Sequence, residues 1–266
     1  MSTPSLPGPA SGRRRQGARL IGRWAPAAVL LGLLVLAWQV VAVHNAYLVP
    51  RIGAILAQLA DHPGEFLAAA AVTLSESGGG LGASFVIAFS LAVAMSYIPV
   101  VERAVMPLAV ILNVTPVVSL APGFAVAFGF TMTPRYLVTG IIVFFPLLVN
   151  SLVGLRAIDD EALQYFQSLD ASRLEVLLHL RIPSSLPFLF AAARICFPLS
   201  IIGAVVSEFS TAGTANGLGS LIEEGFQENY LPQIYAAIFC LSLLGLAFTL
   251  LVTLVERRVL SWGPRR

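Results

Sequence analysis

The chain has 266 residues, of which 57% are hydrophobic and only 11% are charged. A soluble domain carries about 25% charged residues, so this composition excludes a water-soluble globule and also a disordered chain. The formal net charge is +2, and all 16 basic residues are Arg, which excludes a standard Walker A phosphate loop and a lysine Schiff base.

Six apolar stretches are long enough to cross a membrane as helices, which takes about 20 residues each. They cover residues 25–43, 81–98, 105–128, 136–153, 188–206 and 234–255. We therefore predict an all-α fold, a polytopic membrane helix bundle of about six transmembrane helices.

The rest of the chain divides around these stretches. We predict a basic, disordered tail at 1–23, a first transmembrane helix with an outer amphipathic segment at 24–64, a transmembrane domain at 65–260 and a short C-terminal tail at 261–266. Within the outer segment, apolar residues at helical spacing predict a short amphipathic helix over Ile52–Ala60.

The arginines are distributed unevenly between the two ends of the predicted helices. All but two of the 16 arginines lie on one side of the predicted bundle. They precede the first stretch, follow the last, or lie in and beside the connections after the second and fourth stretches. Arg51 and Arg135 lie on the other side. By the positive-inside rule, the arginine-rich side and both termini are expected to be cytoplasmic. The basic run at 13–23 could also contact anionic lipid headgroups, and the alternative is that it only sets topology.

A glycine-rich segment precedes the second apolar stretch. Gly78 and Gly82 form a small-xxx-small pattern, which permits two helices to approach closely. We therefore expect a helix contact on the face that carries these two glycines.

The connection between the fourth and fifth stretches, residues 154–187, carries several helix signals. Asp159 or Asp160 can cap a first helix, Asp170-Ala171 reads as a turn, and Ser172-x-x-Glu175 is a capping box. The second helix is expected to end before Pro183, and Pro187 to lie in the first turn of the fifth span. Two short helices tethered to the membrane at both ends suit the docking of a soluble partner. The alternative is an interfacial hairpin that rests on lipid headgroups.

This connection resembles the cytoplasmic EAA loop of type I ABC import permeases. The family pattern is roughly Glu-Ala-Ala, a Gly after three residues, and later an Ile followed by x-Leu-Pro. Here the chain has Glu161-Ala162-Leu163, then Asp170 in place of the Gly, then Arg181-Ile182-Pro183. The segments 202–209 and 217–219 are similar to the nitrate/sulfonate/taurine-type subfamily, and the resemblance extends over about 48–262.

The resemblance implies a type I ABC importer permease fold, in which residues 154–187 form the coupling-helix loop to a separate ATPase. The residues expected to make that contact are Glu161, Ala162, Leu163, Phe166, Asp170, Ala171, Ser172 and Arg173. The expected partners are ABC ATPase subunits, an extracytoplasmic solute-binding protein, a second permease copy as a homodimer, and membrane lipid, with no nucleic acid. ATP is then used by the partner, and the chain itself is expected to be no enzyme, to bind no cofactor and to lie in the bacterial inner membrane.

Substrates in such systems are small solutes. The resemblance leaves open a nitrate-, sulfonate- or taurine-like anion, a thiamine-precursor pyrimidine, and a riboflavin-like compound. Scarce basic residues in the spans give no support to a fixed anion site.

A few polar residues interrupt the apolar stretches and are candidates for the translocation pathway, because polar groups inside a membrane usually face the bundle interior. They are Asn113, Thr115, Ser119, Asn150 and Glu208. The alternatives are local: hydroxyls near a proline can satisfy backbone carbonyls that the proline leaves without a donor. Glu208 can equally be a solvated charge at the rim.

Two other classes of protein compete with this interpretation. An integral-membrane enzyme would need a cluster of ionisable residues within the spans, and the six stretches contain almost none. A membrane scaffold would use residues 159–182 as an interfacial hairpin. The three His and two Cys show no ligand spacing, so we predict no metal site and no catalytic residue.

Overall fold

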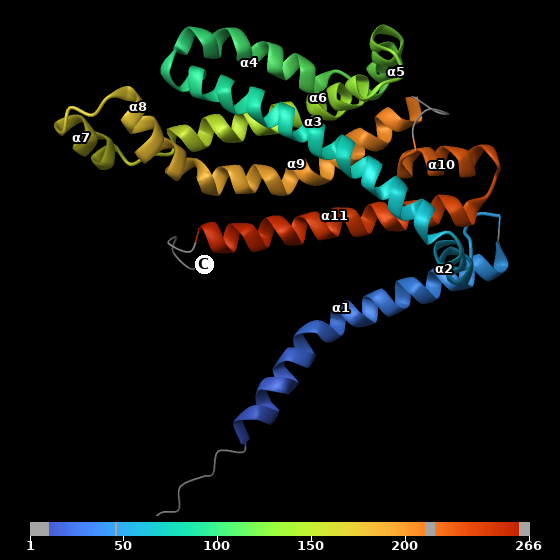
Figure 1. Cartoon of the computed structure of the whole chain (residues 1–266). Coiled ribbons are helices and arrows are strands. Elements are labelled where there is room, and N and C mark those ends of the chain that lie inside the picture. Colours follow the sequence, from blue (N-terminus) through green and yellow to red (C-terminus); the bar gives the residue numbers. More distant parts are fainter. Residues whose placement is uncertain (1–10, 46, 211–215, 261–266) are drawn as a thin grey trace, which may run out of the picture. The chain divides into compact units, whose positions relative to one another are not determined.

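The computed structural model describes residues 11–45, 47–210 and 216–260, with side chains from residue 25 onward. The described residues form helices joined by short connections, and no strand occurs among them (Figure 1). The helices are α1 (Ser11–His44), α2 (Ile52–Asp61), α3 (Pro63–Tyr97), α4 (Pro99–Val114), α5 (Val117–Phe128), α6 (Met132–Arg156), α7 (Asp160–Ser168), α8 (Arg173–Val176), a π-helical segment (Leu177–Arg181), α9 (Ile182–Ser210), α10 (Leu218–Gln227) and α11 (Leu231–Val259). The predicted all-α fold is confirmed, and α2 confirms the predicted amphipathic helix.

Five helical segments within the described ranges are long and apolar enough to cross a membrane. They are Ala25–His44, Pro63–Tyr97, Met132–Arg156, Arg173–Ser210 and Leu231–Val259. A sixth crossing results if α4 and α5 are counted as one bent span. This agrees with the prediction of about six transmembrane helices.

The chain divides into two compact units, residues 1–57 and 58–266. In the first, the indole Nε1 of Trp38 donates a hydrogen bond to the carbonyl oxygen of Pro50 at 3.1 Å. Helix α1 begins at Ser11, inside the tail that the sequence predicts to be disordered. The Arg residues there are good helix formers. Residues 1–10 and 261–266 lie outside the described residues.

The second unit is built around α6, which packs most extensively against α3 and α9. The core between these helices holds small and aliphatic side chains, among them Ala88, Ala92, Val143, Leu148 and Cys196. Small residues allow close approach where lipid supplies no hydrophobic driving force between helices.

A close contact between α3 and α6 lies at Gly80. A Cβ at this position would lie 2.6 Å from the Cβ of Thr139, which is too close for two real atoms. On the same face of α3, the hydroxyl of Ser84 donates a hydrogen bond to the carbonyl oxygen of Gly140 at 2.9 Å. Glycine at position 80 is therefore what lets the two backbones meet.

The sequence predicted this contact for the wrong glycines. No atom lies within 4 Å of the place that a Cβ would take at Gly78 or Gly82. Instead Gly79 and Gly80 face α6, where the Tyr136 ring and Thr139 lie. Residues 78 and 82 share one side of the helix, whereas residues 79 and 80 lie about 100° and 200° around the axis from residue 78, and only the partner helix decides which side is covered.

The third predicted span, residues 105–128, is not a single straight helix. Helix α4 ends at Val114, α5 begins at Val117, and the two are bent by 97°. Pro116 has no N–H to donate and disfavours helical backbone at the residue before it. Thr115 accordingly has an extended ψ of 129°. The predicted stretch is therefore present as a bent pair of helices, with the break at Pro116.

The fifth span begins earlier than predicted, because α8, the π-helical segment and α9 form one continuous stretch, Arg173–Ser210. The predicted end before Pro183 and the first-turn position of Pro187 are both wrong. The N–H of Ile182 donates to the carbonyl oxygen of Leu177, five residues back. This wider turn lets the helix continue at a proline that cannot donate.

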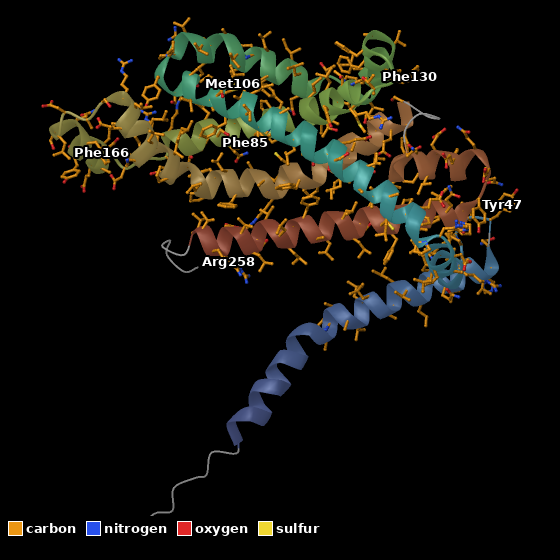
Figure 2. The ribbon with its side chains drawn as sticks, in the orientation of Figure 1. Tyr47, Phe85, Met106, Phe130, Phe166 and Arg258 are labelled. Carbon is orange, nitrogen blue, oxygen red and sulfur yellow. The ribbon has the colours of Figure 1, made fainter. Side chains whose placement is uncertain are left out.

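Within the second unit, α7 and α8 lie at one end and α5 and α10 at the other (Figure 1). Figure 2 shows Phe166 and Arg258 at the first end and Phe130 at the second. The first end carries Arg103, Arg156, Arg173, Arg181, Arg257 and Arg258, whereas Arg135 lies near the beginning of α6, toward the second.

Gly80→Ala is expected to destabilise the second unit, because its methyl group must displace Thr139 or the α6 backbone. Overpacking of this kind costs about 1–3 kcal/mol. Gly78→Ala is the matched control: the same change in the same helix, into open space and with better helix propensity. Thermal unfolding in detergent compares the two, and an equal loss of stability in both would contradict the packing described here.

Candidate functional site

Residues 154–187, here the 154–187 loop, connect α6 to the middle of the fifth span and contain α7 and α8. Of the two expected caps, Asp159 is the one used: its Oδ1 accepts a hydrogen bond from the N–H of Glu161 at 3.1 Å. Asp160 and Glu161 occupy the first turn of α7, where the helix dipole favours negative charge.

The expected turn and capping box follow α7. Asp170 has a φ of 52°, in the left-handed region that Asp tolerates better than most residues. The N–H of Glu175 donates to the hydroxyl of Ser172 at 3.3 Å, and the N–H of Ser172 donates to Glu175 Oε2 at 2.7 Å. Both features of the prediction are confirmed, and they fix the direction in which the chain returns to the membrane helix.

The 154–187 loop presents an uncovered surface. Of the eight residues expected to contact a partner, Glu161, Asp170, Ser172 and Arg173 are exposed and Ala162, Leu163, Phe166 and Ala171 are half-buried. No residue of α7 is buried; its Tyr165 is 63% exposed, and Leu169, which follows the helix, is 61% exposed. Exposed apolar surface rimmed by charge is typical of a protein or membrane contact.

The second half of this loop is braced by Tyr97 at the end of α3. The Tyr97 hydroxyl donates a hydrogen bond to the carbonyl oxygen of Arg173 at 3.0 Å. The guanidinium carbon of Arg181 lies 4.6 Å from the centre of the Tyr97 ring, a cation–π contact. One aromatic side chain thus contacts the beginning of α8 and the end of the π-helical segment.

The first half of the loop is braced by Arg156. Its Nη1 donates to Glu102 Oε1 on α4 at 2.9 Å, and its Nη2 donates to the carbonyl oxygen of Met95 at 3.2 Å. At the base, a Cβ on Gly154 would lie 2.9 Å from the Cβ of Phe188. The 154–187 loop is therefore attached to the corner between α3 and α4 as well as to its own two helices.

The candidate pathway residues are not brought together by any interaction found in the described chain. Asn113 and Ser119 are exposed, on either side of the bend between α4 and α5. The Thr115 hydroxyl donates to the carbonyl oxygen of Ile111 at 2.8 Å, and Asn150 Nδ2 donates to that of Pro146 at 2.8 Å. Both side chains bond to a carbonyl one turn back on their own helix, and a pathway role for these four residues stays a prediction.

Glu208 is fully buried, so the alternative of a solvated rim charge is wrong. Its Oε2 accepts hydrogen bonds from the N–H groups of Gly219 at 2.6 Å and Ser220 at 3.1 Å, in the first turn of α10. Its Oε1 accepts from the hydroxyl of Thr73 at 2.7 Å, and that hydroxyl accepts from the N–H of Leu218 at 2.9 Å. A carboxylate from α9 therefore caps α10, where the dipole favours an anion.

Two positions around this carboxylate must be glycine because no larger residue fits there. A Cβ at Gly217 or Gly219 would collide with the Glu208 side chain. The segment 217–219, which carries part of the family resemblance, is thus shaped around a buried acid.

A buried ion pair lies beside Glu208. Arg135 Nη1 on α6 pairs with Glu76 Oε1 on α3, and the two side chains are 4% and 0% exposed. The carboxyl groups of Glu76 and Glu208 lie against each other. Two carboxylates and one guanidinium from α3, α6 and α9, here the buried acidic cluster, meet at the first turn of α10.

Sequence reasoning missed Glu76 and the pairing of Arg135. Glu76 precedes the second predicted stretch, so it counted as part of an outer connection, whereas α3 begins at Pro63 and carries it inside the bundle. The six predicted stretches do contain almost no ionisable residues, but the helices of the structure extend beyond them and carry Glu76, Arg135 and Glu208. Two sequence signals could have found this pair: Glu76 is an acid just before the second apolar stretch, and Arg135 is an arginine just before the fourth.

Within the described residues, no group of three or more His, Cys, Asp or Glu side chains is placed to hold a metal ion. The buried acidic cluster instead satisfies its charges by the ion pair and by α10.

Comparison with known proteins gives a family match over most of the second unit. The family model described as "Binding-protein-dependent transport system inner membrane component" matches residues 84–261. This range includes the 154–187 loop, Arg135 and Glu208.

Several proteins named as permeases are similar to this chain. The formylaminopyrimidine transport permease protein ThiX of Halalkalibacterium halodurans is 32% identical over 237 residues, which cover 88% of this chain and 94% of the relative. The riboflavin transport system permease protein RibX of Chloroflexus aurantiacus is 35% identical over 161 residues, 60% of this chain and 59% of the relative. The nitrate import permease protein NrtB of Leptolyngbya laminosa is 26% identical over 157 residues, 59% of this chain and 56% of the relative. The substrates named for these relatives differ.

Arg135→Met is expected to destabilise the second unit strongly, because it leaves Glu76 buried beside Glu208 without its cation. Breaking one side of a buried ion pair costs about 3–5 kcal/mol. Arg103→Met, which removes an exposed arginine, should change stability by less than about 0.5 kcal/mol.

The double variant Arg135→Met/Glu76→Gln removes both charges of the pair and should regain part of the loss. Denaturant unfolding in detergent micelles measures all three variants. A loss for Arg135→Met no larger than that for Arg103→Met would contradict a buried ion pair.

Proposed function

Because this chain belongs to the family of binding-protein-dependent transport system inner membrane components, we propose that it couples a separate ATPase to the import of a small solute. Membership makes it a multi-pass membrane protein and the permease component of an ABC transporter. Its similar relatives are transport permeases and not enzymes.

The observation that carries the proposal is that α7 is exposed and that the segments on both sides of it are held against α3 and α4. The eight candidate contact residues, in α7 and in the turn that follows it, are exposed or half-buried, and the two flanks of α7 are braced by Tyr97 and Arg156. A docking helix can transmit force only if it does not move independently of the membrane helices. Glu161 would contact a polar or basic group on the ATPase, Ala162 would permit close approach, and Arg173 would provide a second charge.

ATP hydrolysis is assigned to the partner subunit. The chain contains no Lys, so it has no standard Walker A loop of its own. The solute would be delivered by an extracytoplasmic binding protein, and the pathway would form with a second copy of this chain in the bacterial inner membrane.

The proposed orientation places the α7 end in the cytoplasm together with both termini. Six described arginines of the second unit lie at that end, which supports this side by the positive-inside rule. The basic run near the N-terminus would then meet anionic headgroups of the inner leaflet.

The substrate is proposed to be a small heterocycle and not an inorganic anion. The formylaminopyrimidine permease aligns over 88% of this chain at 32% identity, whereas the nitrate permease aligns over 59% at 26%. A riboflavin-like compound belongs to the same proposed class.

Glu161→Arg is expected to release the ATPase, because it places a like charge against the basic group that Glu161 is proposed to meet. Unfavourable charge contacts cost several kcal/mol, so ATPase retained on the purified chain should fall by at least about tenfold. The measurement is affinity purification of the tagged chain from mildly solubilised membranes, with the ATPase quantified.

Glu224→Arg is the control, since it reverses an exposed acid on α10, at the opposite end of the unit. It should retain the ATPase at the level of the unmodified chain. Absence of any ATPase from the well-folded unmodified chain would overturn the proposed function and leave the loop as an interfacial hairpin.

Asp170→Val tests whether the turn after α7 must adopt its left-handed backbone. A β-branched residue at this φ costs about 1–2 kcal/mol, whereas Gly adopts it freely. Asp170→Val should therefore lose ATPase in the same purification, and Asp170→Gly should retain it fully or better. Equal retention by both variants would show that the turn plays no part in docking.

A further inference from the structure

The 154–187 loop and α10 lie at opposite ends of the second unit, and the same two helices connect them (Figure 1). Helix α9 is continuous with the second half of the loop and carries Glu208, which accepts hydrogen bonds from the first turn of α10. Helix α3 ends at Tyr97, which contacts the loop, and carries Thr73, whose hydroxyl accepts from the N–H of Leu218 at the start of α10. Each of the two helices therefore contacts the loop at one end and α10 at the other.

Tyr97 joins α3 to the second half of the loop through two kinds of contact. Its hydroxyl donates to the carbonyl oxygen of Arg173, and its ring faces the guanidinium group of Arg181. The hydrogen-bond acceptor belongs to the backbone, so it moves with the loop itself and not with a side-chain rotamer. A displacement of α8 would therefore act directly on the last residue of α3.

Arg156 provides a second connection, from the first half of the loop. Its guanidinium group donates to both carboxylate oxygens of Glu102 on α4 and to the carbonyl oxygen of Met95 on α3. A bidentate pair fixes the relative orientation of its two side chains. These side chains are 43% and 30% exposed, and ion pairs in contact with solvent add little to stability. The arrangement therefore constrains direction more than it stabilises the fold.

We propose that Tyr97 and Arg156 are positioning residues, which transmit an ATP-driven displacement of the 154–187 loop to α3, so that α3 and α9 move together at the start of α10. Movement of α9 alone would pull Glu208 away from Thr73, whose hydroxyl donates to it at 2.7 Å. That would leave a buried carboxylate short of a donor, which is unfavourable. The inference rests on the proposed function and assigns the residues that connect the ATPase to the opposite end of the permease.

The test follows α10 with a fluorescent probe while the ATPase works at the other end. Phe226 on α10 is 74% exposed, so Phe226→Cys can carry a polarity-sensitive bimane label once Cys196 and Cys240 are replaced by Ala. The emission of this labelled parent, in complex with the ATPase, is expected to change when ATP and vanadate are added. Tyr97→Phe keeps the ring and removes the hydroxyl. It should reduce the change by at least about twofold, the lower range for residues that carry coupling between two sites.

Ser96→Ala is the matched control, since this neighbouring hydroxyl donates to the carbonyl oxygen of Val93 within α3 itself. Its emission change should equal that of the labelled parent. Arg156→Lys keeps the positive charge but loses the bidentate geometry. It should therefore also reduce the change, whereas a role that needs the charge alone predicts no reduction.

The amount of ATPase retained on the chain should be unchanged in all three variants, because they alter positioning and not docking. An unchanged emission signal in Tyr97→Phe, an equal reduction in Ser96→Ala, or loss of retained ATPase from Tyr97→Phe would each overturn the proposed role. A labelled parent that hydrolyses ATP without any change at α10 would overturn it as well. Failure to obtain any complex with an ATPase would instead count against the proposed function.

Discussion

A carboxylate buried at the end of a membrane helix is the constraint on which much of the second unit depends. Glu208 belongs to α9, yet its hydrogen bonds go to α10 and to Thr73 on α3. An unpaired charge in this position would be severely unfavourable, so the donors must be present whenever the helices pack. The placement of α10, the glycines at 217 and 219 and the polar face of α3 all follow from that one requirement.

The same helix connects this acid to the opposite end of the molecule. Residues 173–210 form one continuous helical segment, with the α7–α8 turn at its beginning and Glu208 near its end. Hydrogen bonding is maintained through the π-helical turn, and the helix continues past Pro187 and Pro198 as far as Ser210. A displacement of the 154–187 loop would therefore reach the buried acidic cluster through a single helix, and also through the brace at Tyr97.

Two prolines show how tertiary context changes a local rule. Pro116 ends α4 and produces a bend of 97°, whereas Pro183 lies inside a continuous helix. Both lack the N–H that an α-helix needs. The difference lies in the preceding turn, which at Leu177–Arg181 widens so that Ile182 donates five residues back. From the sequence the two prolines look alike, and the sequence interpretation assigned the break to the wrong one.

The sequence by itself determined what composition and local chemistry control: an all-helical membrane protein, the capping box at Ser172, the left-handed turn at Asp170 and the resemblance carried by the 154–187 loop. These features depend on residues close together in the chain. Only the tertiary structure decided that Gly80 and not Gly78 meets α6, that Arg135 pairs with Glu76, and that Glu208 caps α10. Each joins residues far apart in the chain, and which face of a helix is covered depends on where its neighbours lie.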